Sequence, residues 1–138
     1  MVNSTKTSVR KVGLIGCGAI GTVFADAIRK NIVICDELVV YDVDLSKAKQ
    51  LQKILKIPIT IVSNIDEMIQ TQPNIIVEAA SQQAVKDYLP KIVAANIEAI
   101  VMSTGALLDM AIDLSKIHVP SGAIGGLDAI ASAALTGD

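Results

Sequence analysis

Residues 12–21 read Val-Gly-Leu-Ile-Gly-Cys-Gly-Ala-Ile-Gly, and this stretch decides the fold. A short apolar run leads straight into Gly16, Gly18 and Gly21, which have the spacing G-x-G-x-x-G. An amphipathic segment follows at once, and a second apolar run then ends on Asp42, 21 positions past the last glycine. This order of strand, glycine turn, helix, strand and acid, with about 20 residues before the acid, predicts a dinucleotide-binding βαβ unit.

Each glycine has a separate physical role in this prediction. Gly16 allows the tight turn out of the strand, Gly18 lets the backbone approach a pyrophosphate, and Gly21 lets the helix pack close against the strand. The helix N-terminus offers free N–H groups and a partial positive charge to the phosphates. Asp42 is expected to accept hydrogen bonds from the adenosine ribose. Glycines also collect in turns for packing reasons alone, but the complete strand–turn–helix–strand context favours the binding interpretation.

The composition suits a single domain with an aliphatic core. The chain has 138 residues, of which 51% are hydrophobic and only 2% aromatic, as expected of a buried parallel sheet rich in Val, Ile and Leu. A net charge of −2 without a basic stripe argues against nucleic acid as a partner. The uncharged stretch 12–25 is too short for a membrane span. Cys17 and Cys35 lack metal-site or C-x-x-C spacing, so Cys17 is interpreted as a packing residue, and two free thiols indicate a reducing cytoplasm.

Apolar periodicity predicts strands and helices that alternate along the chain. Strands are expected near residues 10–15, 37–41, 59–62, 75–78, 99–102 and 118–119, and helices near 19–30, 45–55, 65–70, 82–95, 107–116 and 127–135. Asp44, Asn64 and Ser81 are expected to cap the second, third and fourth helices, and Pro90 to kink or divide the fourth. Leu45 is expected to face inward with the apolar positions that follow it at helical spacing. The fold class predicted is α/β, a Rossmann-type doubly wound parallel sheet with strand order 3-2-1-4-5-6 and a ligand crevice at the carboxyl ends of the strands.

Three later turns follow predicted strands and are expected to line the same crevice. Ala80 and Ser81 follow the fourth strand, where small residues leave room for a cofactor; Ser81 as a helix cap is the alternative, and one hydroxyl can serve both purposes. Residues 103–105 are expected near the middle of the dinucleotide or its nicotinamide ribose, with a plain turn as an equal alternative. The glycine-rich segment 120–126 is expected to abut the nicotinamide end. His118, the only histidine, is interpreted as structural.

Several segments together resemble the L-aspartate dehydrogenase family. The motifs that carry the resemblance are Gly-Leu-Ile-Gly-Cys-Gly-Ala-Ile-Gly at 13–21, Tyr-Asp at 41–42, Val-Glu-Ala-Ala-Ser at 77–81, Ala-Val-Lys at 84–86, Ser-Thr-Gly at 103–105 and, most specifically, Pro-Ser-Gly-Ala-Ile-Gly-Gly-Leu-Asp at 120–128. Members of this family couple the oxidative deamination of L-aspartate, giving iminoaspartate or oxaloacetate, to the reduction of NAD(P). In several organisms this reaction feeds NAD biosynthesis. The resemblance implies a cytoplasmic oxidoreductase, a homodimer when full length.

The resemblance also implies cofactor-binding residues on each of the turns. They are Ala19 and Ile20 at the pyrophosphate, Asp42 at the adenosine ribose, Ala80 and Ser81 along the cofactor with Asp87 and Tyr88 nearby, Met102 and Ser103 at the nicotinamide half, and Ala123 at the carboxamide. With the residues expected from the glycine motif and the 103–105 turn, the set is completed by Gly16, Gly18, Gly21 and Thr104. No metal ligand is expected.

Two departures from the family pattern shape the prediction. Val43 and Asp44 follow Asp42, where family members often have an arginine that can accept a 2′-phosphate. Carboxylates repel a phosphate, so NAD is predicted and NADP is less favoured. Family members also have a substrate domain that carries the catalytic histidine. Residues 1–138 are therefore expected to form an NAD(P)-binding domain that ends within the first helix of a missing catalytic domain, has no catalytic residue of its own, and binds NAD without turnover.

Two other interpretations stay open. The chain could be the NAD-binding domain of another two-domain reductase of amino-acid metabolism, such as a homoserine dehydrogenase or a relative of dihydrodipicolinate reductase; the motif at 120–128 argues against these. It could also be a stand-alone module that senses NAD and regulates a partner. A reading frame that continues for about another domain's length favours an enzyme over a module.

Overall fold

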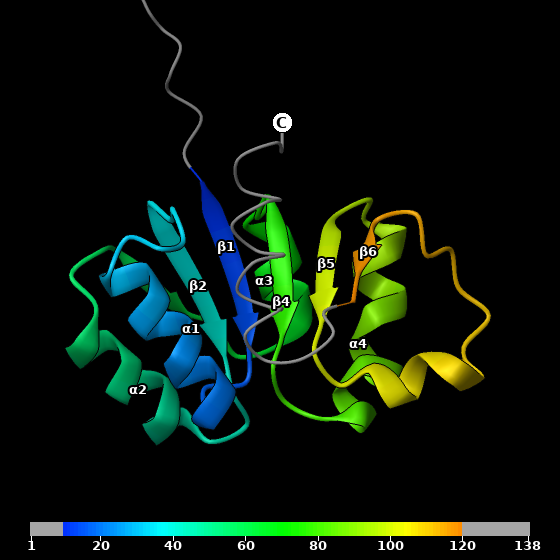
Figure 1. Cartoon of the computed structure of the whole chain (residues 1–138), viewed down its shortest axis with the longest axis horizontal. Helices are drawn as coiled ribbons and strands as arrows, with labels where there is room; N and C mark the ends of the chain where they lie inside the picture. Colours follow the sequence, from blue (N-terminus) through cyan, green and yellow to red (C-terminus); the bar gives the residue numbers. More distant parts are fainter. Residues whose placement is uncertain (1–9, 120–138) are drawn as a thin grey trace, which may run out of the picture.

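Six parallel strands form one sheet within residues 10–119, the part of the chain that the computed structural model describes (Figure 1). The elements in chain order are β1 (Lys11–Ile15), α1 (Ala19–Arg29), β2 (Glu37–Tyr41), α2 (Leu45–Ile54), β3 (Ile59–Ile61), α3 (Ile65–Gln70), β4 (Ile75–Glu78), α4 (Gln82–Ala94), β5 (Glu98–Val101), a 3₁₀ helix (Thr104–Asp109) and β6 (Ile117–His118). The strand order is β3-β2-β1-β4-β5-β6, which confirms the predicted topology.

The register brings the carboxyl ends of the central strands to one line. Ile15 of β1 pairs with Tyr41 of β2 on one side and with Glu78 of β4 on the other, and Glu78 pairs in turn with Val101 of β5. All four strands point toward the lower edge of the sheet in Figure 1. The loops that begin after these four residues therefore leave the same edge side by side.

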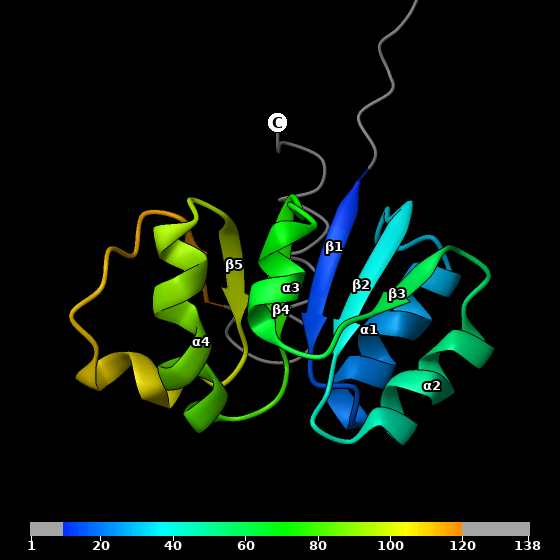
Figure 2. The ribbon, with the colours of Figure 1, turned by 180° about the vertical axis from the view of Figure 1, so that it is seen from behind.

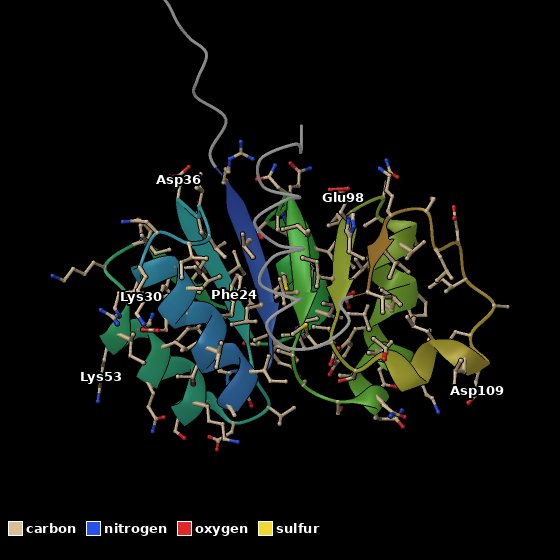
Figure 3. All side chains as sticks on the ribbon, viewed as in Figure 1. Phe24, Lys30, Asp36, Lys53, Glu98 and Asp109 are labelled. Atoms are coloured by element: carbon tan, nitrogen blue, oxygen red, sulfur yellow. The ribbon has the colours of Figure 1, made fainter. Side chains whose placement is uncertain are left out.

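Both faces of the sheet are covered, which is why its strands read as continuous apolar runs. Helices α1 and α2 cover one face of β1 and β2 (Figure 1), and α3 and α4 lie on the opposite face (Figure 2). Successive residues of β2 alternate between the two cores: Leu38 and Val40 pack with α1 and α2, and Val39 packs with α3 and α4. Phe24 of α1 points inward between the helix and the sheet and is only 2% exposed, while the labelled charged side chains lie at the periphery (Figure 3).

Three helices begin at the side-chain caps that the sequence predicts. Asp44 accepts a hydrogen bond from the backbone N–H of Ser46 at 3.0 Å, and Ser81 accepts one from that of Ala84 at 3.0 Å. Asn64 accepts from the Glu67 N–H at 2.8 Å, and the Glu67 carboxylate in turn accepts from the Ser63 N–H at 2.7 Å. The caps satisfy N–H groups that the first turn of a helix leaves without partners.

Three expectations about local structure are wrong. The helix predicted over 107–116 is absent: the 3₁₀ helix ends at Asp109 and an irregular segment runs to β6. Asp113 there accepts a hydrogen bond from the Ser115 N–H at 2.9 Å, a local bond that competes with helix formation. Pro90 does not divide α4, which runs unbroken from Gln82 to Ala94 with Pro90 on its exposed side. Leu45 does not face inward; it is 51% exposed at the start of α2. The predicted helix at 127–135 lies outside the described residues.

Candidate dinucleotide site

A cleft of about 560 Å³ opens at the carboxyl edge of the sheet, where the loops after β1, β2 and β4 meet. Its walls come from these three loops and from the first turns of the helices that follow them. The lining residues are Ile15, Gly16, Gly18, Ala19, Ile20, Tyr41, Asp42, Val43, Lys47, Ala79, Ala80, Ser81, Gln83, Ala84, Asp87 and Tyr88. The cleft lies at the point where the strand order reverses, the usual ligand position in this kind of sheet.

The three glycines of the G-x-G-x-x-G motif, two in the loop after β1 and Gly21 in α1, meet three different steric demands. Gly16 has φ +94°, and a Cβ there would lie 2.8 Å from the carbonyl carbon and oxygen of Ala79. A Cβ on Gly21 would collide with the carbonyl oxygen of Gly16. A Cβ on Gly18 would meet no atom within 4 Å, because it would stand in open space at the wall of the cleft. Gly16 and Gly21 are therefore required by the fold, whereas Gly18 is not required by any described contact.

The N-terminus of α1 has the features of an anion site. No side chain caps it within the described structure, and its first turn carries no acidic residue. In contrast, α2, α3 and α4 each have a side-chain cap. The uncapped amides sit in a helix of 11 residues beside Ala19 and Ile20, both of which line the cleft. Free N–H groups and the positive end of the helix dipole suit a phosphate there. The open space at Gly18 also fits a pyrophosphate that approaches the backbone closely.

Asp42 links the glycine loop to the end of β2. One oxygen of its carboxylate accepts a hydrogen bond from the Cys17 N–H at 2.7 Å, and the other accepts from the Asp44 N–H at 2.8 Å. The side chain is half-buried and lines the cleft. Each carboxylate oxygen can accept a second hydrogen bond, so the group can hold the loop in place and still accept from a ribose hydroxyl.

The charges along the cleft are mixed. The acids Asp42 and Asp87 and the exposed Lys47 of α2 belong to its lining, and Asp44 does not. The Asp44 carboxylate instead accepts two hydrogen bonds from Ser46, at 3.0 Å from the backbone N–H and 2.6 Å from the hydroxyl. These hydrogen bonds hold the pKa of Asp44 below its usual range. Of the two acids expected to repel a 2′-phosphate, only Asp42 lies in the cleft wall.

The loop after β4 supplies the opposite wall. Ala80 and Ser81 both line the cleft, and Ser81 accepts the capping hydrogen bond of α4 through its hydroxyl oxygen. The capping hydrogen bond occupies one lone pair of that oxygen, so the hydroxyl can still donate its proton to a ligand. One hydroxyl can therefore serve both purposes, as the sequence analysis suggested. The backbone N–H groups of Ala80 and Ser81 are bonded to the carboxylate of Glu78, each at 2.9 Å.

Glu78 is a residue of this region that the sequence analysis missed. It is 4% exposed and is the buried charged side chain of the described structure. Charged residues at the ends of apolar strands are usually exposed, so the position of Glu78 does not suggest burial. No basic residue nearby in the sequence suggests a buried ion pair. The predicted strand order held the only signal, because it places β4 between β1 and β5 and so encloses its last residue on both sides.

The residues after β5 stand beside the cleft and do not line it. Met102 and Ser103 donate backbone hydrogen bonds to the Glu78 carboxylate at 3.1 Å and 2.8 Å, and Thr104 begins the 3₁₀ helix. Both the expected place near the dinucleotide and the alternative of a plain turn are compatible with this position. Ala123 lies outside the described residues.

The two tyrosines of the chain meet at the side of the cleft. The hydroxyl oxygens of Tyr41 and Tyr88 lie 3.4 Å apart, and their rings are edge to face with centroids 5.9 Å apart. The hydrogen bond with Tyr41, together with burial, raises the pKa of Tyr88 to about 12. Tyr88 therefore carries a neutral phenol at physiological pH, next to Asp87, which also lines the cleft.

Both thiols are buried and expected to be unreactive in the folded protein. Burial is the main cause that raises the pKa of Cys17 and of Cys35 from 9.0 to about 12, which leaves on the order of a thousandfold less thiolate at neutral pH. Titration with a chromogenic disulfide reagent at pH 8 should therefore detect no fast thiol in the native protein and two thiols in denaturant. Fast reaction of Cys17 itself under native conditions would contradict its packing role.

The protein-family model described as "Homoserine dehydrogenase, NAD binding domain" matches residues 16–116 of the chain. The chain belongs to this family of NAD-binding domains. The matched region begins at Gly16 of the glycine loop and spans the other loops of the cleft and the strands β2 to β5. NAD is therefore the cofactor assigned to the cleft, and the uncapped α1 amides and the open space at Gly18 fit such a ligand.

Curated relatives confirm the resemblance to L-aspartate dehydrogenases. Proteins named L-aspartate dehydrogenase from Methanocaldococcus jannaschii and Archaeoglobus fulgidus are 39% and 42% identical to the chain, over 87% and 88% of its length. The chain covers 48% and 50% of those proteins, so it spans about half the length of the relatives it matches. A myo-inositol dehydrogenase from Corynebacterium glutamicum shares the fold, with a TM-score of 0.62 at 22% identity over 81% of this chain and 36% of that chain. Among residues 10–119, no helix is long and apolar enough to cross a membrane.

Proposed function

We propose that the chain is the cofactor-binding half of an NAD-dependent L-aspartate dehydrogenase. The observation that carries the proposal is the glycine-walled cleft at the uncapped start of α1, in a chain about 40% identical to proteins of that name. The reaction would be the oxidative deamination of L-aspartate to iminoaspartate, with hydride transfer to NAD. Bound NAD would supply the hydride acceptor, and the protein would bind and orient it.

Residues at different positions in the cleft would contact different parts of the dinucleotide. The amides at Ala19 and Ile20 would bond the pyrophosphate, with Gly18 leaving the space for it, and Asp42 would accept from the adenosine ribose. The other residues proposed to contact the cofactor are Gly16, Gly21, Ala80, Ser81, Tyr88, Met102, Ser103, Thr104 and Ala123. For Gly21 the described contact is to the loop backbone, so its contribution would be to hold the loop shape.

Residues 1–138 would act as the NAD(P)-binding domain, with the catalytic groups in a further domain. That arrangement is supported by the half-length match to the relatives. Hydride transfer needs an amino acid held opposite the nicotinamide, and the further domain would hold it there. We further propose a cytoplasmic homodimer that feeds NAD biosynthesis and binds neither nucleic acid nor membrane.

Purified protein of these 138 residues is expected to bind NAD and to lack aspartate dehydrogenase activity. Calorimetric titration should detect saturable NAD binding, and the absorbance of NADH should not rise on addition of L-aspartate. Aspartate-dependent NADH formation by the 138 residues would contradict the proposed division of labour, and absence of NAD binding would contradict the site itself.

The substrate assignment has one specific competitor, because the family description names homoserine dehydrogenase. In the protein that contains both halves, L-aspartate should support NAD reduction and L-homoserine should not. The reverse preference would assign the chain to that other enzyme, and activity with neither amino acid would favour another two-domain reductase of amino-acid metabolism.

A further inference from the structure

The buried carboxylate of Glu78 has no cationic partner among the described residues. It is 4% exposed at the end of β4, and the ion pairs of the described structure do not include it. A buried charge is strongly unfavourable unless hydrogen bonds replace its hydration. The donors that surround Glu78 should therefore explain why an acid stands in this position.

Five hydrogen bonds converge on this one carboxylate. One oxygen, Oε2, accepts from the N–H groups of Ala80 and Ser81 at 2.9 Å each and from the hydroxyl of Ser103 at 2.8 Å. The other, Oε1, accepts from the N–H groups of Met102 and Ser103 at 3.1 Å and 2.8 Å. The Met102 N–H is shared with the main-chain carbonyl oxygen of Glu78, also at 3.1 Å. The other three N–H groups and the Ser103 hydroxyl point at a common site that suits an acceptor with two oxygens, and an ionised carboxylate is such a group.

The five bonds join two loops that are 21 residues apart in sequence. The loop after β4 forms one wall of the cleft through Ala80 and Ser81, and the loop that contains Met102 and Ser103 leaves the next strand. Neither loop is bonded to the other directly among the described hydrogen bonds; both are bonded to Glu78. The loops on the adenosine side of the cleft are held by a different carboxylate. Asp42 accepts hydrogen bonds from the Cys17 N–H and the Asp44 N–H.

We propose that Glu78 is a positioning residue that holds the loops after β4 and β5 as one wall for the nicotinamide half of the dinucleotide. The proposal rests on the proposed function of the cleft as an NAD site. Glu78 does not touch the cofactor; it fixes the backbone that does. Its removal should therefore weaken ligands that reach both loops and should spare a ligand that occupies the adenosine diphosphate half alone.

Glu78→Gln is the first test. The amide replaces one acceptor oxygen by an NH₂ group that faces N–H donors. Either the N–H groups of Ala80 and Ser81 or those of Met102 and Ser103 then lose their side-chain acceptor. We expect the affinity for NAD+ to fall at least about tenfold, equivalent to about 1.4 kcal/mol, while the affinity for ADP changes by less than about threefold. Calorimetric titrations of the full chain with NAD+ and with ADP measure this split. A general loss of stability would lower both affinities together.

Glu78→Asp is the second test, and it can still decide the proposal if the Glu78→Gln variant does not fold. An aspartate can still bond the N–H groups two and three residues later, as in an Asx turn. One methylene shorter, it should not reach Met102 and Ser103. The same split between NAD+ and ADP is expected from this variant, with a smaller change in the melting temperature than for Glu78→Gln.

Glu67→Gln is the matched control, because Glu67 also accepts a backbone hydrogen bond, from Ser63, but at the start of α3 away from the cleft lining. It should leave both affinities unchanged. Equal loss of NAD+ and ADP binding in both Glu78 variants, or no loss in either, would overturn the role of Glu78. Failure of the unmodified chain to bind NAD+ and ADP would instead overturn the proposed function.

Discussion

A Gly18→Val protein is expected to bind NAD+ at least about a hundredfold more weakly, a loss of about 2.8 kcal/mol, and to lose less stability than a Gly16→Ala protein. A Cβ at Gly18 meets no atom within 4 Å, so the expected cost to the fold is the preference of the α1 N-cap for glycine over valine. Gly18 lines the cleft beside the uncapped amides of α1. A branched side chain there would keep a pyrophosphate away from those amides. Calorimetric titration with NAD+ and thermal unfolding of the same sample measure the two expectations.

Gly16→Ala is the matched comparison within the same loop. Its φ of +94° and the 2.8 Å approach of a Cβ to the Ala79 carbonyl make any side chain there strained. We expect a stability loss of about 1–3 kcal/mol from the backbone conformation, seen as a lower melting temperature. If Gly18→Val destabilised the chain as much as Gly16→Ala does, or if it bound NAD+ normally, the open side of the loop would not be the pyrophosphate surface.

The contrast between these glycines shows what the sequence could and could not predict. The G-x-G-x-x-G spacing identified the loop, and the acid on the second strand identified the cleft, because both depend on local order along the chain. The division of roles between Gly16 and Gly18 depends on the approach of Ala79. That contact joins residues far apart in sequence, so the pattern anticipated a tight turn at Gly16 but not its contact with Ala79.

The strand order was also predictable, since short strands that alternate with amphipathic helices have few ways to cross over in a parallel sheet. The segment after β5 was not. Its apolar residues suggested a helix over 107–116, yet Leu107, Met110 and Ile112 are partly buried against the core of α3 and α4 without one. Tertiary packing and the local bonds of Asp113 decided its conformation there.

Glu78 shows the same limit within the site. Sequence patterns treat a charged residue at a strand end as exposed, and the partners of this one are backbone N–H groups, which every residue except proline has. Their convergence arises only when β4 and β5 are paired in register, with Glu78 beside Val101. The glycine spacing predicted the backbone N–H groups at the start of α1, whereas no sequence pattern marks the backbone donors that converge on Glu78.

Asp42→Ala is expected to weaken NAD+ binding about tenfold or more and to bring the NAD+ and NADP+ affinities close to each other. The carboxylate would accept from the ribose hydroxyls of NAD and repel a 2′-phosphate. Its loss removes both effects and leaves Lys47 as the remaining charged side chain on this side of the cleft. A lysine ammonium attracts a phosphate, so NADP+ should lose less affinity than NAD+ or gain some. Titration of the variant with each cofactor gives the ratio.

Asp44→Ala separates this effect from the charge of the region as a whole. Asp44 lies outside the cleft lining, and its carboxylate caps α2 through Ser46. Its removal should lower the melting temperature, as the loss of a helix cap does, and should leave the NAD+ to NADP+ ratio unchanged, because water screens an exposed charge. A ratio that shifted equally in both variants would mean that the net charge of the segment after β2 selects the cofactor. A shift in Asp42→Ala alone would assign the choice to the one carboxylate that the glycine loop holds in the cleft wall through the Cys17 N–H.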